Sequence, residues 1–262
     1  MPVVKTEDGA QIFYKDWGAG QPIVFSHGWP LSSDTWDTQM LFFGSRGYRV
    51  VAHDRRGHGR STQTWNGNDM NTFADDLSTV IEALDLKNVL LVGHSIGAGE
   101  VARYIGRHGA SRIAKLVLIG SVTPVLLQSD SNPDGVPLSF FDEIRASVAG
   151  TRGQFFKDLS GPYFGLNRPD AKDSPGLRER YWLQGMLGGV KSIYDSIEAF
   201  SATDFTADLK RISVPTLVLH GEDDQIVPAG LTAHNTVKLV RNATLKMTCS
   251  RKTLPVEAGV LS

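Results

Sequence analysis

The sequence lacks several features that mark whole classes of protein. It has one cysteine, Cys249, which excludes an internal disulfide and a disulfide-stabilised scaffold. Its 27 basic and 28 acidic residues give a net charge of −1, so nothing indicates binding to nucleic acid or to an anionic membrane. No apolar run reaches membrane-spanning length, and Met1 to Thr6 lack the apolar core of a signal peptide. We therefore expect a cytoplasmic protein, with no nucleic-acid or membrane partner, that acts on a small neutral molecule.

What the sequence does contain is an alternation of short apolar runs with helical patterns. Alternation at this density is typical of a mostly parallel sheet with helices on both faces. A hairpin around Asp8-Gly9 adds an antiparallel edge. We therefore predict an α/β fold with an eight-stranded, mostly parallel sheet. The expected strands are 3–17 (both strands of the hairpin), 22–26, 48–52, 89–92, 114–120, 214–221 and 243–247.

Between residues 123 and 204 this alternation stops. The segment has helical character with Pro and Gly interruptions, and it is rich in aromatic side chains. Ligands of such sheets bind at the carboxyl ends of the strands. We therefore expect a helical cap that walls a pocket there with apolar side chains; a helical extension packed elsewhere is the alternative. The predicted domains are a core formed by 1–122 and 205–262 and a cap formed by 123–204.

One motif organises the rest of the chain. Gly93-His94-Ser95-Ile96-Gly97 fits the pattern G-x-S-x-G, follows an apolar strand and precedes a helical segment. This context is that of a nucleophile elbow, in which glycines leave room for a strained turn that presents the serine hydroxyl. Ser95 is therefore the predicted nucleophile of an α/β-hydrolase; an ordinary glycine-rich turn is the alternative.

The remaining catalytic groups are expected near strand ends. In α/β-hydrolases an acid follows the serine along the chain, and Asp224, just past a strand, is the best candidate. Asp223 and Glu222 are its rivals on the same loop. An oxyanion hole needs two amides, which we expect from Ile96, the residue after the nucleophile, and from Trp29 in the loop after the strand 22–26.

The general base is the missing member. It should follow the acid, yet the only histidine downstream is His234, inside an expected helix, and 249–262 contain none. Pro255 and Gly259 also interrupt any final helix. The triad is incomplete unless a rearrangement brings His234 to the site. We expect neither a base nor a metal ligand among the loop histidines upstream, which are His27, His53, His58 and His94.

Four motifs together carry a family resemblance, from the N-terminus to about Met247. The chain resembles the cofactor-free (non-heme) haloperoxidases, chloroperoxidases and perhydrolases of the α/β-hydrolase fold, with their aryl-esterase and lactonase relatives. The resemblance implies an acyl-enzyme formed from a short ester or carboxylic acid and transferred to water or hydrogen peroxide. It implies no heme, metal or flavin, and a homo-oligomer; Pro30 favours peracid formation. The motifs are His27-Gly28-Trp29-Pro30, 54–61, 93–100 and 221–228.

The chain also departs from the family. Ile96-Gly97-Ala98 replaces the usual Thr-Gly-Gly or Met-Gly-Gly, a mild change, whereas Lys252-Thr253-Leu254 stands where the family carries Pro-His-Gly. We hypothesise a truncated or frame-altered end, which sequencing the source DNA beyond this point tests. Two functions follow: a serine hydrolase with an impaired or unconventional base, or an inactive hydrolase fold with a binding or structural role.

Overall fold

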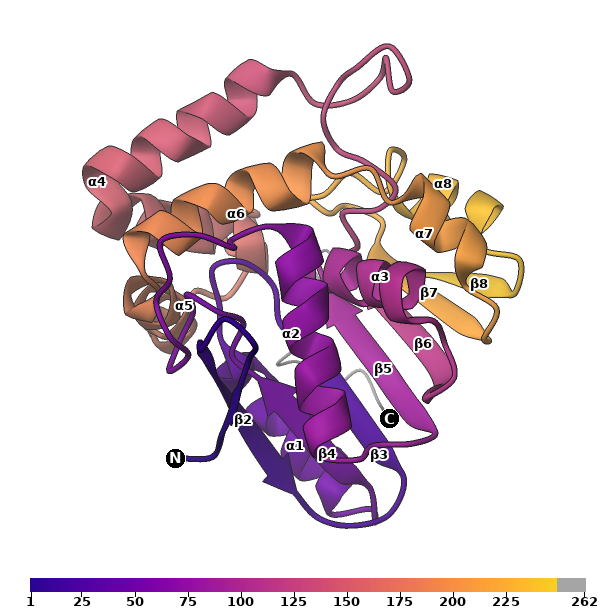
Figure 1. Cartoon of the computed structure of the whole chain (residues 1–262). Helices are drawn as coiled ribbons and strands as arrows, with labels where there is room; N and C mark the ends of the chain where they lie inside the picture. Colours follow the sequence, from indigo (N-terminus) through magenta and orange to yellow (C-terminus); the bar gives the residue numbers. More distant parts are fainter. Residues whose placement is uncertain (249–262) are drawn as a thin grey trace.

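The computed structural model describes residues 1–248, and the prediction about the final helix concerns 249–262, which lie outside the described residues. Within 1–248, eight strands form one sheet in the order β1-β2-β4-β3-β5-β6-β7-β8 (Figure 1). β2 pairs antiparallel with β1 and β4, and all other neighbours pair in parallel. The predicted eight-stranded, mostly parallel sheet is confirmed. The strands are β1 Val3–Lys5, β2 Gln11–Trp17, β3 Pro22–Ser26, β4 Arg49–His53, β5 Val89–His94, β6 Ile113–Ile119, β7 Thr216–Gly221 and β8 Ala243–Thr248.

Helices pack on both faces of the sheet, and β3 is therefore buried on both faces. Val24 points into the core shared with α2 and α3, whereas Ile23 and Phe25 point into a second core with Trp36 and Met40 at the start of α1. This alternation follows from the two-residue period of a strand. The helices are η1 Ser33–Trp36 (a 3-10 turn), α1 Asp37–Gly44, α2 Met70–Ala83, α3 Ile96–His108, α4 Leu138–Phe164, α5 Pro175–Leu187, α6 Val190–Ala202, α7 Thr206–Arg211 and α8 Ala233–Leu239.

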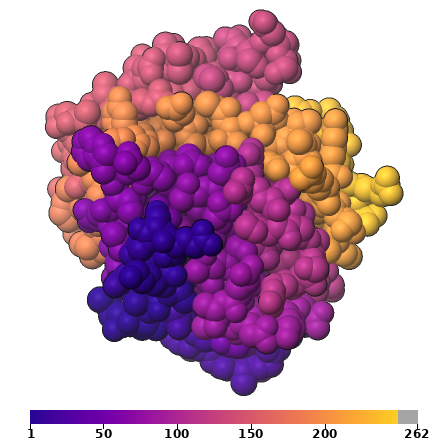
Figure 2. Space-filling view, viewed as in Figure 1, coloured from indigo at the N-terminus to yellow at the C-terminus, as the bar shows by residue number. Residues whose placement is uncertain are grey.

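α4 to α6 are three of the four helices between β6 and β7, and they lie beyond the ends of the strands (Figures 1 and 2). α4 is the outermost of the three in this view and packs against α5 and α6. It bends where Thr151 leaves the helical conformation (φ −122°, ψ 43°), and it contains Pro162. None of the helices in 1–248 is long and apolar enough to cross a membrane.

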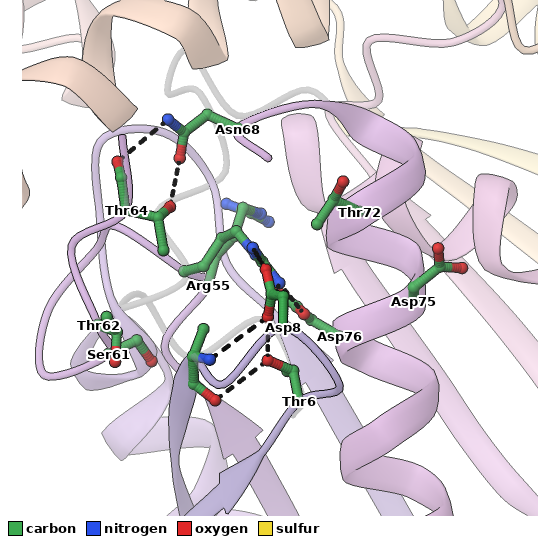
Figure 3. Close-up of polar contacts among 12 residues, drawn as sticks. Thr6, Asp8, Arg55, Ser61, Thr62, Thr64, Asn68, Thr72, Asp75 and Asp76 are labelled. Atoms are coloured by element: carbon green, nitrogen blue, oxygen red, sulfur yellow. Dashed lines mark hydrogen bonds and ion pairs between the residues drawn. The ribbon is translucent and has the colours of Figure 1, made fainter. Parts of the chain in front are cut away.

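A buried arginine fastens the N-terminal hairpin to the helical layer. Arg56 donates two hydrogen bonds of 2.6 Å to the carboxylate of Asp76 on α2 and one of 2.8 Å to Asp8 at the hairpin turn. Thr6 closes the turn by donating to Asp8 at 2.5 Å. Figure 3 shows Asp8 and Asp76 side by side. A bidentate arginine–carboxylate pair fixes geometry as well as adding stability, so it sets the start of the loop after β4 against α2.

The turn from β5 into α3 is closely packed against neighbouring backbone. Ser95 has a positive φ (φ 55°, ψ −119°), which costs a non-glycine residue energy. A Cβ on Gly93 would lie 2.3 Å from the carbonyl oxygen of Gly97, and one on Gly97 would lie 2.4 Å from the carbonyl oxygen of Ser26. Both glycines are therefore required by contacts with backbone atoms, which cannot move aside as side chains do.

We expect Gly97→Ala to lower the free energy of unfolding by about 1–3 kcal/mol or more, because its methyl group would overlap the Ser26 carbonyl. Gly150→Ala is the matched control: it lies inside α4, and its methyl group would meet nothing within 4 Å. That substitution should raise stability by about 0.5–1 kcal/mol. Urea unfolding of both variants measures this, and equal effects would contradict the steric account of the elbow.

Candidate active site

A cavity of about 320 Å³ opens beside Ser95. Its walls are mostly apolar and aromatic, and they come from the β3 loop, the turn after β5, the segment after β6, the helices α4 to α6 and the loop after β7. The volume suits a small ligand. The lining residues are Trp29, Ser95, Val122, Leu126, Val136, Phe140, Phe141, Glu143, Ile144, Ser147, Phe155, Leu159, Tyr163, Tyr181, Phe200, Gln225, Ile226 and Val227.

The two predicted oxyanion donors flank the serine. Ile96 is the first residue of α3, where backbone N–H groups have no acceptor within the helix and the helix dipole is positive. The loop after β3 passes close to the elbow, since a Cβ on Gly28 would lie 3.4 Å from Cβ of Ser95. Trp29 follows, lines the cavity and donates its indole N–H to the carbonyl of Ile193 at 3.0 Å. Its side chain therefore has a wall-forming role besides the proposed backbone role.

A buried ion pair ties this loop to α3. The guanidinium of Arg55 donates to Glu100 of α3 at 2.5 Å, to the carbonyl of His27 at 2.8 Å and to Oγ of Ser26 at 3.1 Å. The Arg55 backbone N–H donates to Nε2 of His27 at 3.0 Å, which leaves Nδ1–H of His27 to donate to the carbonyl of Gly28 at 2.8 Å. Burial lowers the pKa of His27 well below its usual value, so the ring is a neutral structural link.

The other loop histidines are buried as well. Nε2 of His53 contacts Glu100 at 2.8 Å, and Nδ1–H of His58 donates to the carbonyl of Arg56 at 3.0 Å. Nδ1 of His94 has no hydrogen-bond partner among the described residues. The positions of His53 and His58 agree with the predicted loop-tying role. In residues 1–248 no group of three or more His, Cys, Asp or Glu side chains is placed to hold a metal ion.

Of the three candidate acids on the loop after β7, Asp224 alone has a buried side chain. Its side chain is 2% exposed, and Oδ1 accepts hydrogen bonds of 2.9 Å from the amides of Ile226 and Val227. Asp223 is 66% exposed and pairs with Arg168, and Glu222 is exposed too. The geometry thus separates Asp224 from its rivals, although its catalytic role stays a prediction.

Sequence reasoning passed over His220, at the end of β7. It is fully buried, its Nε2 donates to the carbonyl of Val227 at 2.8 Å and lies 3.5 Å from Oδ2 of Asp224. The signal was available, because a polar residue at the carboxyl end of a parallel strand faces the site edge. His234, by contrast, is exposed on α8 and does not line the cavity, so nothing in its position supports a role as base.

The buried histidines predict acid sensitivity. Burial lowers the pKa of His58 and of His94 to about 4, whereas an unfolded histidine titrates near pH 6.5. The unfolded chain therefore binds more protons between these values, and stability present above about pH 6.5 is lost as the pH falls towards 4. We expect the free energy of unfolding to fall by up to about 1.4 kcal/mol per pH unit for each histidine.

Urea unfolding between pH 8 and pH 5 checks this. His58→Gln should have a shallower pH dependence than the parent protein, whereas His234→Gln, which alters an exposed ring, should keep the parent's slope. An unchanged slope in His58→Gln would show that the burial of this ring does not control acid stability.

Comparisons with known proteins agree with this geometry. A family model described as "alpha/beta hydrolase fold" matches residues 21–248. A non-heme haloperoxidase of Rhodococcus erythropolis is 56% identical to this chain, and the match covers 94% of this chain and 90% of the haloperoxidase. A bifunctional esterase/perhydrolase of Acinetobacter calcoaceticus is 52% identical, and the match again covers 94% of this chain and 90% of the relative. The crystal structure of a bromoperoxidase from Bacillus anthracis superposes with a TM-score of 0.89, at 37% identity over 94% of this chain and 90% of that one. The chain therefore belongs to the α/β-hydrolase fold family and, within it, to the non-heme haloperoxidases and their esterase and perhydrolase relatives.

Proposed function

We propose that this protein is a serine hydrolase of the haloperoxidase, perhydrolase and esterase type, in which Ser95 forms an acyl-enzyme that is transferred to water or to hydrogen peroxide. The observation that carries the proposal is the strained turn that holds Ser95 at the wall of an apolar cavity and at the start of α3. The relative named as a bifunctional esterase/perhydrolase supports both acceptors, and no organic cofactor or metal is required. We further propose that 123–204 form a cap over a core of 1–122 and 205–262.

The proposed reaction begins when Oγ of Ser95 attacks the carbonyl carbon of an ester. The carbonyl oxygen becomes an oxyanion, which the backbone amides of Trp29 and Ile96 would stabilise together with the positive end of the α3 dipole. The oxyanion then collapses, the alcohol departs, and the acyl group remains on Oγ. Attack by water releases a carboxylic acid, and attack by hydrogen peroxide releases a peracid. The apolar cavity holds the rest of the substrate away from bulk water.

The proton of Ser95 needs an acceptor, and here the chain departs from its family. We propose that the family's C-terminal histidine is missing, because no histidine follows His234 in the sequence. In this proposal Asp224 would orient a base, but Nε2 of His220 is already bound to a backbone carbonyl and His234 is exposed. A hydrolase without its base retains only about 10³–10⁴-fold acceleration over water. The second candidate, an inactive hydrolase fold that only binds ligands, rests on the same missing histidine.

We expect p-nitrophenyl acetate to give a burst of p-nitrophenol from the parent protein followed by slow turnover, because acylation by an activated ester depends less on a base than deacylation does. Ser95→Ala should give neither, and Ser139→Ala, a serine exposed on α4, should behave like the parent protein. Stopped-flow absorbance measures the burst. Equal traces for the parent and Ser95→Ala would favour the inactive, ligand-binding fold instead.

Added imidazole should supply the missing base. We expect the turnover of the parent protein to rise by about tenfold or more when imidazole is added. Imidazole also reacts with the ester directly, so the rate of Ser95→Ala at the same imidazole concentration is subtracted. Asp224→Asn should reduce this gain, because the buried carboxylate would hold the added imidazole as an ion pair or hydrogen-bond partner. Asp223→Asn, its exposed neighbour, should not. A gain that is equal in both variants would remove Asp224 from the proposed triad.

A further inference from the structure

The cavity at Ser95 has a single charged side chain on its walls. Of the lining residues, all of which lie in the described part of the chain, only Glu143 belongs to the charged types Asp, Glu, Lys and Arg, and none is a histidine. Nearly all the others are aliphatic or aromatic. Glu143 is exposed, so its carboxylate lies at the solvent edge of this wall. A lone carboxylate there gives the cavity a preference for one sign of charge, which salt screens.

The helix geometry turns Glu143 towards this cavity. Phe140 and Ser147 line the same cavity and lie three residues before and four residues after Glu143 on α4. Positions at these spacings share one face of a helix, so Glu143 stands in the middle of the stripe that faces the cavity. α4 is the outermost helix over the strand ends (Figure 1), whereas Ser95 lies at the turn between β5 and α3. The carboxylate therefore meets the tail of a substrate rather than its reacting carbonyl.

No protein group neutralises this carboxylate. Its neighbour Asp142 accepts a hydrogen bond of 2.9 Å from Arg145, which also lies 3.7 Å from Glu198. Within residues 1–248 the side chain of Glu143 makes neither an ion pair nor a hydrogen bond, and Arg145 does not line the cavity. The adjacent acid is thus paired away from the site, and the charge of Glu143 is left for a ligand.

We propose that Glu143 selects substrates by charge: the site takes esters whose apolar tail ends in a cationic group such as an ammonium, and it disfavours free carboxylates. The apolar walls bind the tail and the carboxylate binds its cationic end. As a consequence, the site accepts acyl groups from esters in preference to ionised carboxylic acids. The choice of ester rests on the proposed function, whereas the charge preference concerns binding alone and is testable without catalysis.

Three six-carbon probes with a cationic, a neutral and an anionic head group test the binding: hexylamine, hexan-1-ol and hexanoate, titrated calorimetrically into the parent protein. We expect affinity to fall in that order. In Glu143→Gln the ratio of hexylamine to hexanoate affinity should fall by about tenfold or more, and in Glu143→Lys the order should reverse, because one close charge contact in water changes affinity by about fivefold for each probe. High salt should compress the parent's ratio towards that of Glu143→Gln.

Asp142→Asn is the matched control, since it removes an acid from the same helical turn that is already paired with Arg145. It should keep the parent's ratio of affinities. A ratio in Glu143→Gln equal to that of the parent protein would overturn the proposal. A failure of all three probes to bind would overturn it too. The probes carry no ester, so this outcome does not depend on the chemistry at the serine.

Kinetics then extend the test to esters. p-Nitrophenyl 4-(trimethylammonio)butyrate and its neutral isostere p-nitrophenyl 5,5-dimethylhexanoate differ by one charge. The ratio of their kcat/KM values, cationic over neutral, should fall about fivefold in Glu143→Gln and stay unchanged in Asp142→Asn. Loss of both reactions in Ser95→Ala establishes that the measured rates come from the site; a charge preference seen in binding with no Ser95-dependent reaction would reject the proposed function alone.

Discussion

The close backbone packing around Ser95 is the constraint on which the rest of the site depends. Gly93 and Gly97 approach carbonyl oxygens so closely that any side chain there would force backbone to move. This packing holds Ser95 at a positive φ and begins α3 directly behind it. One local arrangement therefore fixes the proposed nucleophile and points the positive end of a helix at the carbonyl that it would attack.

The second half of the proposed oxyanion hole lies on a different loop, and the Arg55–Glu100 pair joins the two. Glu100 belongs to α3, one turn after Ile96, and Arg55 holds the carbonyl of His27 in the loop that leads to Trp29. Both side chains are buried. Removing one partner of such a pair would leave an uncompensated buried charge, at a cost of about 3–5 kcal/mol. A substantial part of the stability of the fold therefore depends on the ion pair that positions this loop against α3.

The sequence predicted those parts of the molecule that depend on local pattern. Alternating apolar runs predict the eight strands, and the spacing of Gly93, Ser95 and Gly97 predicts the elbow, because period and steric fit are written into neighbouring residues. The pattern ranked Asp224 ahead of Asp223 only by its place in the loop: both follow β7, and it is packing that makes one side chain 2% and the other 66% exposed. The alignment of Glu143 with the cavity likewise required the path of α4, which the sequence left open.

The structure also explains how Asp224, the proposed acid, could be held in place without the proposed catalytic histidine. Oδ1 of Asp224 accepts hydrogen bonds from two backbone amides, and Oδ2 lies 3.5 Å from Nε2 of His220. Hydrogen bonds from amides to a carboxylate are among the stronger ones in proteins, so the buried charge is compensated by groups that belong to the core itself. The proposed oxyanion donors and the elbow are likewise built from residues 26–119. Loss of the base would therefore lower the rate of reaction without removing a contact that supports these parts of the fold, and in such a protein binding specificity can persist when turnover is slow.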